Sequence, residues 1–157
     1  MAKRQKPGKY KKGKKKAVEV KTYEYNDYIE EIKNLKKYAE SVDYLRLFND
    51  SINDESGESS VWKFKSNLQT FIKKHILLKD IFGKEAFTYF QHYFSKMAGK
   101  EEFLKTCQDI VEKINTQTVG GLYDQLLIYN VKPLSKEDSD KFFDKLLKRC
   151  VILIENN

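Results

Sequence analysis

The residues of this chain whose types and spacing could do chemistry are mainly basic ones at the start of the sequence. Residues 1–16 read MAKRQKPGKYKKGKKK, with nine Lys or Arg side chains and no acid. Such a run neutralises nucleic-acid phosphates and releases their counterions, which gives affinity without sequence specificity. It also fits a nuclear or nucleolar localisation signal, and a solvated tail that only aids solubility is a third interpretation. We predict that the arm binds RNA through Lys3, Arg4, Lys6, Lys9, Lys11, Lys12, Lys14, Lys15 and Lys16.

The usual sequence signatures of catalysis are missing. His75 and His92 each lack a second His or Cys at metal-ligand spacing, and a lone helical histidine is more often a buried or hydrogen-bonded side chain. The pair Gly120-Gly121 has neither the spacing nor the lysine of a phosphate-binding loop. We therefore expect a protein that is not an enzyme and that has no cofactor and no metal site.

The two cysteines and the hydropathy of the chain bear on the compartment. Cys107 and Cys150 lie far apart in sequence on apolar helix faces, a pattern that favours buried thiols in a reducing compartment over a disulfide. No stretch approaches the ~18 apolar residues of a membrane span, and no apolar segment follows the basic start as in a signal peptide. We expect a soluble protein that is not secreted.

The charge of the chain divides it into two parts. The formal net charge is +7, yet residues 17–157 hold 21 Lys or Arg against all 23 Asp or Glu, so the excess of positive charge lies in the arm. Nine like charges with Pro7, Gly8 and Gly13 cannot bury enough apolar surface to order the arm. We predict a disordered arm over residues 1–22 and one folded domain over residues 24–155.

Apolar residues behind the arm recur at three- and four-residue spacing, which is the period of an amphipathic helix. Asn26 or Asp27, Ser59 or Ser60, and Ser135 with Asp138 are expected to cap the first, third and last helices, and Gly99 to end the fourth. The predicted fold is all-α, a single compact bundle of about five to seven helices. The pattern places helices at about 28–39, 41–52, 61–77, 86–98, 103–114 and 136–154. Residues 122–129 are either a short further helix or an extended apolar run.

The predicted helix at 61–77 combines an apolar stripe with a basic side. The basic side would lie along RNA phosphates through Lys63, Lys65, Lys73 and Lys74, although an ordinary solvated face is the competing interpretation. Trp62 stands off the centre of the stripe, so it either clamps the first turn to a neighbouring helix or is exposed as a platform for base stacking; burial is favoured for so large a ring. The stripe is Val61, Phe64, Leu68, Phe71, Ile72 and Ile76.

The same segment resembles a known family. Trp62-Lys63-Phe64, followed by Gln69-Thr70-Phe71 and then His75, resembles the signature of the WKF domain, and Val42-Asp43-Tyr44-Leu45 is similar to the segment that precedes that signature. The resemblance covers about residues 41–98 and extends less specifically to residue 115. It implies a nucleolar protein that contacts ribosomal RNA during assembly of the large ribosomal subunit. It implies nothing for the last helix.

These observations lead to one expected function and one alternative. We expect a non-enzymatic RNA-binding factor of ribosome biogenesis, located in the nucleus and nucleolus, whose partners are ribosomal RNA and the pre-ribosomal particle. The alternative is a nuclear protein–protein interaction module whose arm is only a localisation signal. Binding to DNA is less favoured, because no recognition helix can be identified in the sequence.

Overall fold

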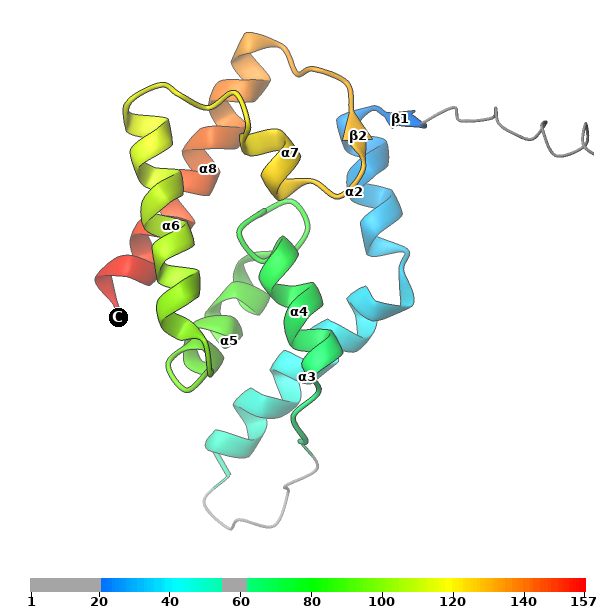
Figure 1. Ribbon diagram of the computed structural model, residues 1–157. Helices are drawn as coiled ribbons and strands as arrows, with labels where there is room; N and C mark the ends of the chain where they lie inside the picture. Colours follow the sequence, from blue (N-terminus) through cyan, green and yellow to red (C-terminus); the bar gives the residue numbers. More distant parts are fainter. Residues whose placement is uncertain (1–20, 55–61) are drawn as a thin grey trace, which may run out of the picture.

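The computed structural model describes residues 21–54 and 62–157, and within these ranges the protein is mostly helical with very little strand (Figure 1). The all-α prediction is confirmed. Residues 1–20 of the predicted arm and the Ser59 or Ser60 cap lie outside the described residues. The described elements are β1 (Thr22–Tyr23), α2 (Tyr25–Lys33), α3 (Lys36–Ile52), α4 (Ser66–His75), α5 (Lys84–Phe94), α6 (Lys100–Asn115), α7 (Leu122–Leu126), β2 (Asn130–Val131) and α8 (Lys136–Glu155).

Helices α2 and α3 replace the two helices predicted at 28–39 and 41–52, so this part of the prediction was wrong. The backbone is extended at Leu35, where the sequence has no glycine or proline to mark a break. The break allows the Tyr38 hydroxyl to donate to the carbonyl oxygen of Ile81 at 2.9 Å. Asn26 and Asp27 lie inside the first turn of α2 and do not cap it. Tertiary contacts therefore decide where these helices divide.

Helix α4 begins at Ser66 and not at residue 61 as predicted, and residues 62–65 form a non-helical segment before it. The backbone N–H of Lys65 donates to the hydroxyl of Tyr44 on α3 at 3.3 Å, which fixes this segment across that helix. Phe64, predicted in the buried stripe, is 57% exposed, so that prediction was wrong. Val61 lies outside the described residues. The tripeptide Trp62-Lys63-Phe64 is thus a connection that precedes the helix.

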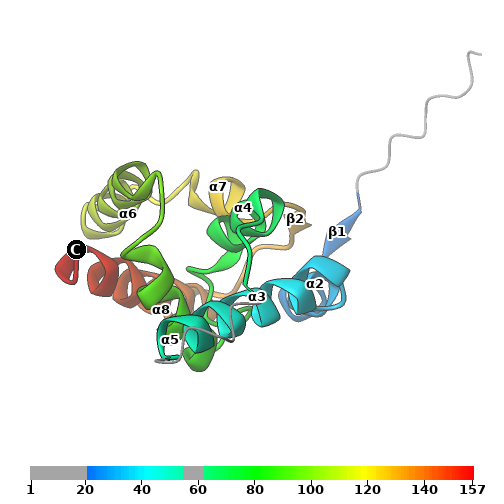
Figure 2. The same cartoon turned by 90° about the horizontal axis from the view of Figure 1, so that it is seen from below.

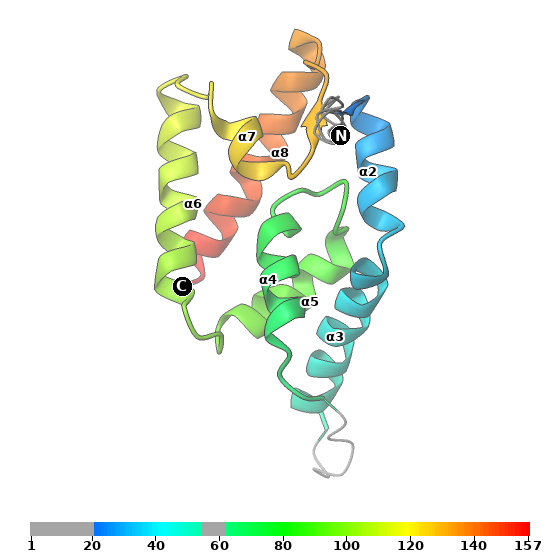
Figure 3. The same ribbon diagram turned by 45° about the vertical axis from the view of Figure 1, so that its right-hand side comes forward.

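The core is continued by a segment without regular structure, residues 76–82, between α4 and α5. Ile76, Leu77, Leu78, Ile81 and Phe82 are all at least 96% buried there. Helix α5 supplies the neighbouring aromatic layer. The rings of Phe87, Phe90 and Phe94 stack along the helix. Phe90 and Phe94 also contact the ring of Phe103 on α6. Figure 3 shows α4 between α3 on one side and the pair α6 and α8 on the other.

Helices α6 and α8 pack side by side, and both cysteines lie in their contact. Cys107 and Cys150 are fully buried free thiols, as predicted. The hydrogen bond to Cys107, together with burial, raises the pKa of the Cys150 thiol. Both cysteines therefore belong to the packed core.

The first residues described are tied to the region before α8. Strands β1 and β2 pair in parallel, with Thr22 opposite Asn130 and Tyr23 opposite Val131, so Thr22 belongs to the folded domain and not to the predicted arm. The Ser135 hydroxyl accepts from the backbone N–H of Asp138 at 3.1 Å, which confirms the predicted cap. Gly99 is left-handed with φ +80°, but it precedes α6 and does not directly end α5. Figure 2 shows β1 and the C-terminal end of α8 at opposite ends of the molecule.

Candidate nucleic-acid interface

Trp62 is anchored in a cluster of aromatic rings from α3 and α5. Its ring centroid lies 5.3 Å from that of Tyr44, 5.1 Å from that of Phe48 and 6.2 Å from that of Tyr93. Edge-to-face and tilted contacts of this kind add to the effect of burial. Of the two interpretations of Trp62, the clamp is confirmed and the exposed stacking platform is wrong.

A chain of side-chain hydrogen bonds links two of the residues around Trp62 to α4. The Tyr44 and Tyr93 hydroxyls are 2.9 Å apart, and the Tyr93 hydroxyl donates to Oε1 of Gln69 at 2.6 Å. Burial and the hydrogen bond with Tyr44 raise the pKa of the Tyr93 hydroxyl, so it stays protonated and can donate. Tyr93 of α5 therefore contacts residues from three separate sequence motifs, namely Tyr44, Trp62 and Gln69.

Two of the predicted RNA-binding lysines lie beside this clamp. Lys63 and Lys65 are exposed and line a groove of about 440 Å³ with Trp62 and residues of α3. Two acids share the groove, but each has an ion pair within α3: Asp43 with Arg46 at 3.3 Å, and Glu40 with Lys36 at 3.9 Å. Neither Lys63 nor Lys65 forms an ion pair with any residue that the structure describes.

A second pocket lies on the same two helices, at the start of α3, and has a volume of about 420 Å³. Lys74 lines it, whereas Lys73 is half-buried and lines neither hollow. We call this hollow the α3–α4 pocket. Its lining is Leu35, Lys36, Lys37, Asn67, Thr70, Phe71, Lys74, His75 and Ile128.

Sequence reasoning missed Lys36, Lys37 and Ile128 as members of this surface. The sequence offered no signal for the two lysines, because the predicted helix ran through them and the break at Leu35 was not visible. Ile128 comes from a distant segment between α7 and β2 and is 41% exposed. The fold therefore brings Lys74 together with two lysines of the preceding helix, and separates it from Lys63 and Lys65.

His75 lies in the wall of the α3–α4 pocket with none of its surface exposed. Its ring centroid is 4.5 Å from that of Phe71, and neither ring nitrogen has a hydrogen-bond partner in the structure. Burial, with a smaller contribution from the charge of Lys74, lowers the pKa of His75 to about 4. By contrast, Nδ1 of the exposed His92 is 2.8 Å from Oδ1 of Asn49. Burial as predicted is confirmed for His75, and hydrogen bonding is confirmed for His92.

The buried imidazole predicts a specific dependence of stability on pH. Its folded pKa of about 4 lies below the ordinary histidine pKa of 6.5. The unfolded state therefore binds more protons between these two values, so the contribution of His75 is complete above pH 6.5 and is lost as the pH falls towards 4. We expect a loss of about 3 kcal/mol in the free energy of unfolding across this window. Urea titrations at several pH values measure it.

His75→Phe is the variant that isolates this effect, because it keeps a ring in the core and removes the titrating group. The loss between pH 6.5 and 4 should be smaller in this variant than in the wild type. His92→Phe, at an exposed position on α5, is the matched control and should lose as much as the wild type. Equal losses in the wild type and His75→Phe would contradict the assignment.

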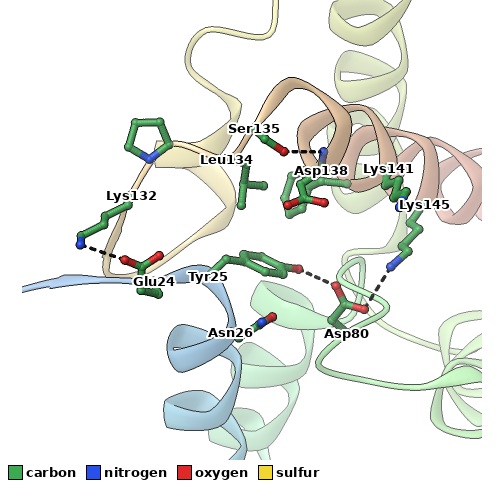
Figure 4. A pocket seen from close by; sticks show the side chains of 12 residues that line it. Glu24, Tyr25, Asn26, Asp80, Lys132, Leu134, Ser135, Asp138, Lys141 and Lys145 are labelled. Atoms are coloured by element: carbon green, nitrogen blue, oxygen red, sulfur yellow. Dashed lines mark hydrogen bonds and ion pairs between the residues drawn. The ribbon is translucent and has the colours of Figure 1, made fainter.

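A third pocket, of about 510 Å³, lies between β1, α2 and the start of α8, and it is the most polar of the three (Figure 4). Asp80 accepts from the Tyr25 hydroxyl at 2.7 Å and pairs with Lys145 at 3.3 Å, while Lys132 pairs with Glu24 at 2.8 Å. Because its central charges neutralise one another, this pocket is interpreted as a joint between elements. No group of three or more residues suited to hold a metal ion occurs within residues 21–54 and 62–157.

A comparison with protein families finds a match that covers the Trp62 clamp. The model of the WKF domain matches residues 43–110, a stretch that includes Tyr44, the Trp62 clamp and all of α4. Residues 43–110 are a WKF domain. The comparisons with curated proteins and with solved structures found no match. No helix in the described part of the chain is long and apolar enough to cross a membrane.

The signature residues of the WKF domain divide into two groups in this structure. Trp62, Gln69 and Phe71 are packed or hydrogen-bonded in the core, and so is His75. Lys63, Phe64 and Thr70 are exposed on the surface formed by α3 and α4. The buried group positions the exposed group, so the surface of α3 and α4 is the candidate interface of the domain.

Proposed function

We propose that this protein is a non-enzymatic RNA-binding factor that acts in the nucleus and nucleolus on the precursor of the large ribosomal subunit. The observation that carries the proposal is a set of exposed lysines on α3, on α4 and on the segment before α4 that have no ion pair with any described residue. These are Lys37, Lys63, Lys65 and Lys74. The proposed partners are ribosomal RNA and the pre-ribosomal particle.

Charge gives the two parts of the chain different roles in this proposal. The arm carries nine cations and the rest of the chain has slightly more acids than bases. The arm therefore supplies most of the non-specific attraction to phosphates. The WKF domain supplies placement, because its lysines are held on a rigid surface whose spacing matches only certain arrangements of phosphates.

The test is binding of the full chain to structured fragments of large-subunit ribosomal RNA at several salt concentrations. Replacing Lys63, Lys65 and Lys74 by Glu should lower the affinity about 10- to 100-fold and reduce the salt slope by about 2. Deleting residues 1–16 should reduce the slope further. The measurement is fluorescence anisotropy of labelled RNA.

The matched control reverses three lysines of α6, Lys100, Lys105 and Lys113, which changes the net charge equally on a different helix. The control should lower the affinity much less than the triple change on α4 and its preceding segment. Equal losses for the two triple variants would show that only net charge matters and would reject the proposed interface.

A protein–protein interaction module is the second candidate, because Phe64 is 57% exposed beside the groove that Trp62 lines. An exposed aromatic side chain is a frequent anchor of protein interfaces. Exchanging residues 1–16 for an unrelated nuclear localisation signal separates the two candidates. Full rescue of function by the exchanged arm favours the module, and loss of function favours RNA contact.

A further inference from the structure

Two stacked tyrosines form an exposed aromatic surface where the described part of the chain begins. Tyr23 ends β1 and Tyr129 directly precedes β2 (Figure 1). Their ring centroids are 5.5 Å apart and their planes are inclined by 27°. Tyr129 is 37% exposed, and Nζ of the exposed Lys21 lies 4.8 Å from the centroid of the Tyr23 ring. We call Lys21, Tyr23 and Tyr129 the tyrosine platform, which combines flat apolar rings with a cation.

The folded domain holds both rings of the tyrosine platform in place. The backbone N–H of Lys132 donates to the carbonyl oxygen of Tyr23 at 2.8 Å, next to the pairing of β1 with β2. The Tyr129 ring meets the ring of the fully buried Tyr28 at 82°, with the centroids 6.0 Å apart. The Tyr28 hydroxyl in turn accepts from the backbone N–H of Ile128 at 3.1 Å. A ligand that stacks here therefore needs little ordering of the protein.

The hydroxyl groups of the platform take no part in the hydrogen bonds of the described fold. Every other tyrosine that the structure describes has its hydroxyl in a hydrogen bond with a described residue. The hydroxyls of Tyr23 and Tyr129 have no such partner. Each can still donate and accept. The two tyrosines that stack on each other are thus the two whose polar ends are free for a ligand.

The charge along the chain next to the platform favours an anionic ligand. Nine cations lie in residues 1–16, and only residues 17–20 separate them from Lys21. Lys16 and Lys21 are five positions apart, so they lie within about 18 Å of each other. Glu24, the acid that follows Tyr23, is already paired with Lys132 at 2.8 Å. An RNA whose phosphates bind the arm therefore has its bases close to the platform.

Resting on the RNA-binding function proposed above, we propose that the tyrosine platform takes one unpaired base of an RNA whose phosphates are bound by residues 1–16. The base stacks on the exposed ring surface of Tyr23 and Tyr129, and Lys21 contacts the adjacent phosphate. Bases stack on aromatic side chains when they are unpaired, whereas those of a continuous duplex are enclosed by their neighbours. The platform therefore selects RNA with a single-stranded segment at the junction of the arm and the folded domain.

The test uses the full chain and a labelled RNA hairpin with a single-stranded tail of uridines. The same hairpin is measured again after a complementary strand has been annealed to the tail. The wild type should bind the unpaired tail about tenfold more tightly than the annealed one, as expected for one stacked base. The annealed strand adds negative charge, so charge alone predicts the opposite order. Fluorescence anisotropy at a fixed salt concentration measures both affinities.

Variants of Tyr129 separate stacking from apolar contact. Tyr129→Leu removes the ring, keeps an apolar side chain and should lower the affinity for the unpaired tail about tenfold. Tyr129→Phe keeps the ring and should lose less. Tyr89→Leu, at a half-buried position on α5, is the matched control and should keep the wild-type preference. An unchanged preference in Tyr129→Leu, or an equal loss in Tyr89→Leu, would overturn the platform.

Photochemical crosslinking provides a second readout that does not depend on the folding of a variant. Iodouridine in the tail reacts on irradiation with an aromatic side chain in contact with it, and mass spectrometry identifies the residue. We expect crosslinks to Tyr23 or Tyr129 in the wild type. Crosslinks to Tyr10 or Phe64 in their place, or equal affinities for the two RNAs, would overturn the platform and leave RNA binding intact. Failure to bind either RNA would overturn the proposed function itself.

Discussion

Replacing Arg149 by glutamate is expected to lower the free energy of unfolding by more than about 4 kcal/mol, which is a large part of the stability of a typical domain. Arg149 is 95% buried on α8 and its Nη1 donates to the carbonyl oxygen of Ile76 at 2.7 Å. Its guanidinium lies 4.3 Å from the centroid of the Phe87 ring. A carboxylate at this position would be buried beside a carbonyl oxygen without a donor. Thermal unfolding followed by circular dichroism measures the effect.

The physical reason is that Arg149 caps another helix from a distance. Ile76 is the C-cap residue of α4, and its carbonyl oxygen is among those that no helical N–H can reach. A cation at a helix C-terminus is also favoured by the helix dipole. Burial lowers the pKa of Arg149 to about 10, which still leaves it charged at neutral pH. One side chain therefore joins α8 to the end of α4 and to α5.

Arg149→Met separates the charge from the volume of the side chain. Met keeps an unbranched apolar stem against Phe87 and loses the hydrogen bond, so we expect a cost of about 2 kcal/mol. Arg46→Met is the matched control, because Arg46 is exposed and its two ion pairs on α3 are worth little in water. Equal effects of the two Met variants would contradict the role given to Arg149.

Trp62→Ala is expected to destabilise the protein by about 3 kcal/mol, because the indole fills the space between three aromatic rings of α3 and α5. For a chain of this size the loss corresponds to a fall of about 6–12 °C in Tm. Circular dichroism is the suitable measurement, since Trp62 is the single tryptophan of the chain and its fluorescence disappears with it.

Phe64→Ala, two residues away, is the matched control for this prediction. Phe64 is 57% exposed, so its removal should change the free energy of unfolding by no more than about 0.5–1 kcal/mol. If Trp62→Ala were as harmless as Phe64→Ala, Trp62 would not be the clamp that the ring contacts indicate. The pair of variants thus separates the buried from the exposed half of the WKF signature.

The sequence predicted several elements well because their signals are local. The Ser135 cap depends on residues three positions apart, and the wide apolar face of α6 repeats over four turns. The burial of Cys107 and Cys150 followed from the same periodicity. Where the signal was weaker, the prediction failed: Phe64 fits the stripe of a helix, but the clamp on Trp62 and the bond from Lys65 to Tyr44 hold that segment out of helical conformation.

The candidate interface depended on the tertiary structure to a greater degree. Lys63, Lys65 and Lys74 were recognisable as basic residues, yet their separation into a groove and a pocket depends on where α4 begins. Lys36 and Lys37 lie at the start of α3 because the helix breaks at Leu35, where the sequence has no glycine or proline to indicate a break. Ile128 reaches the pocket from a segment more than fifty residues beyond α4.

The sequence by itself determined that this chain is helical, that its positive charge is concentrated in residues 1–16, and that it carries the signature of a WKF domain, because composition, helical periodicity and short motifs are local properties. Only the tertiary structure decided which signature residues are buried and which are exposed. It also decided that Arg149 caps α4 and that His75 is left without a hydrogen-bond partner. Burial and hydrogen bonding arise from contacts between segments far apart in the chain, and these are set by packing and not by neighbours in sequence.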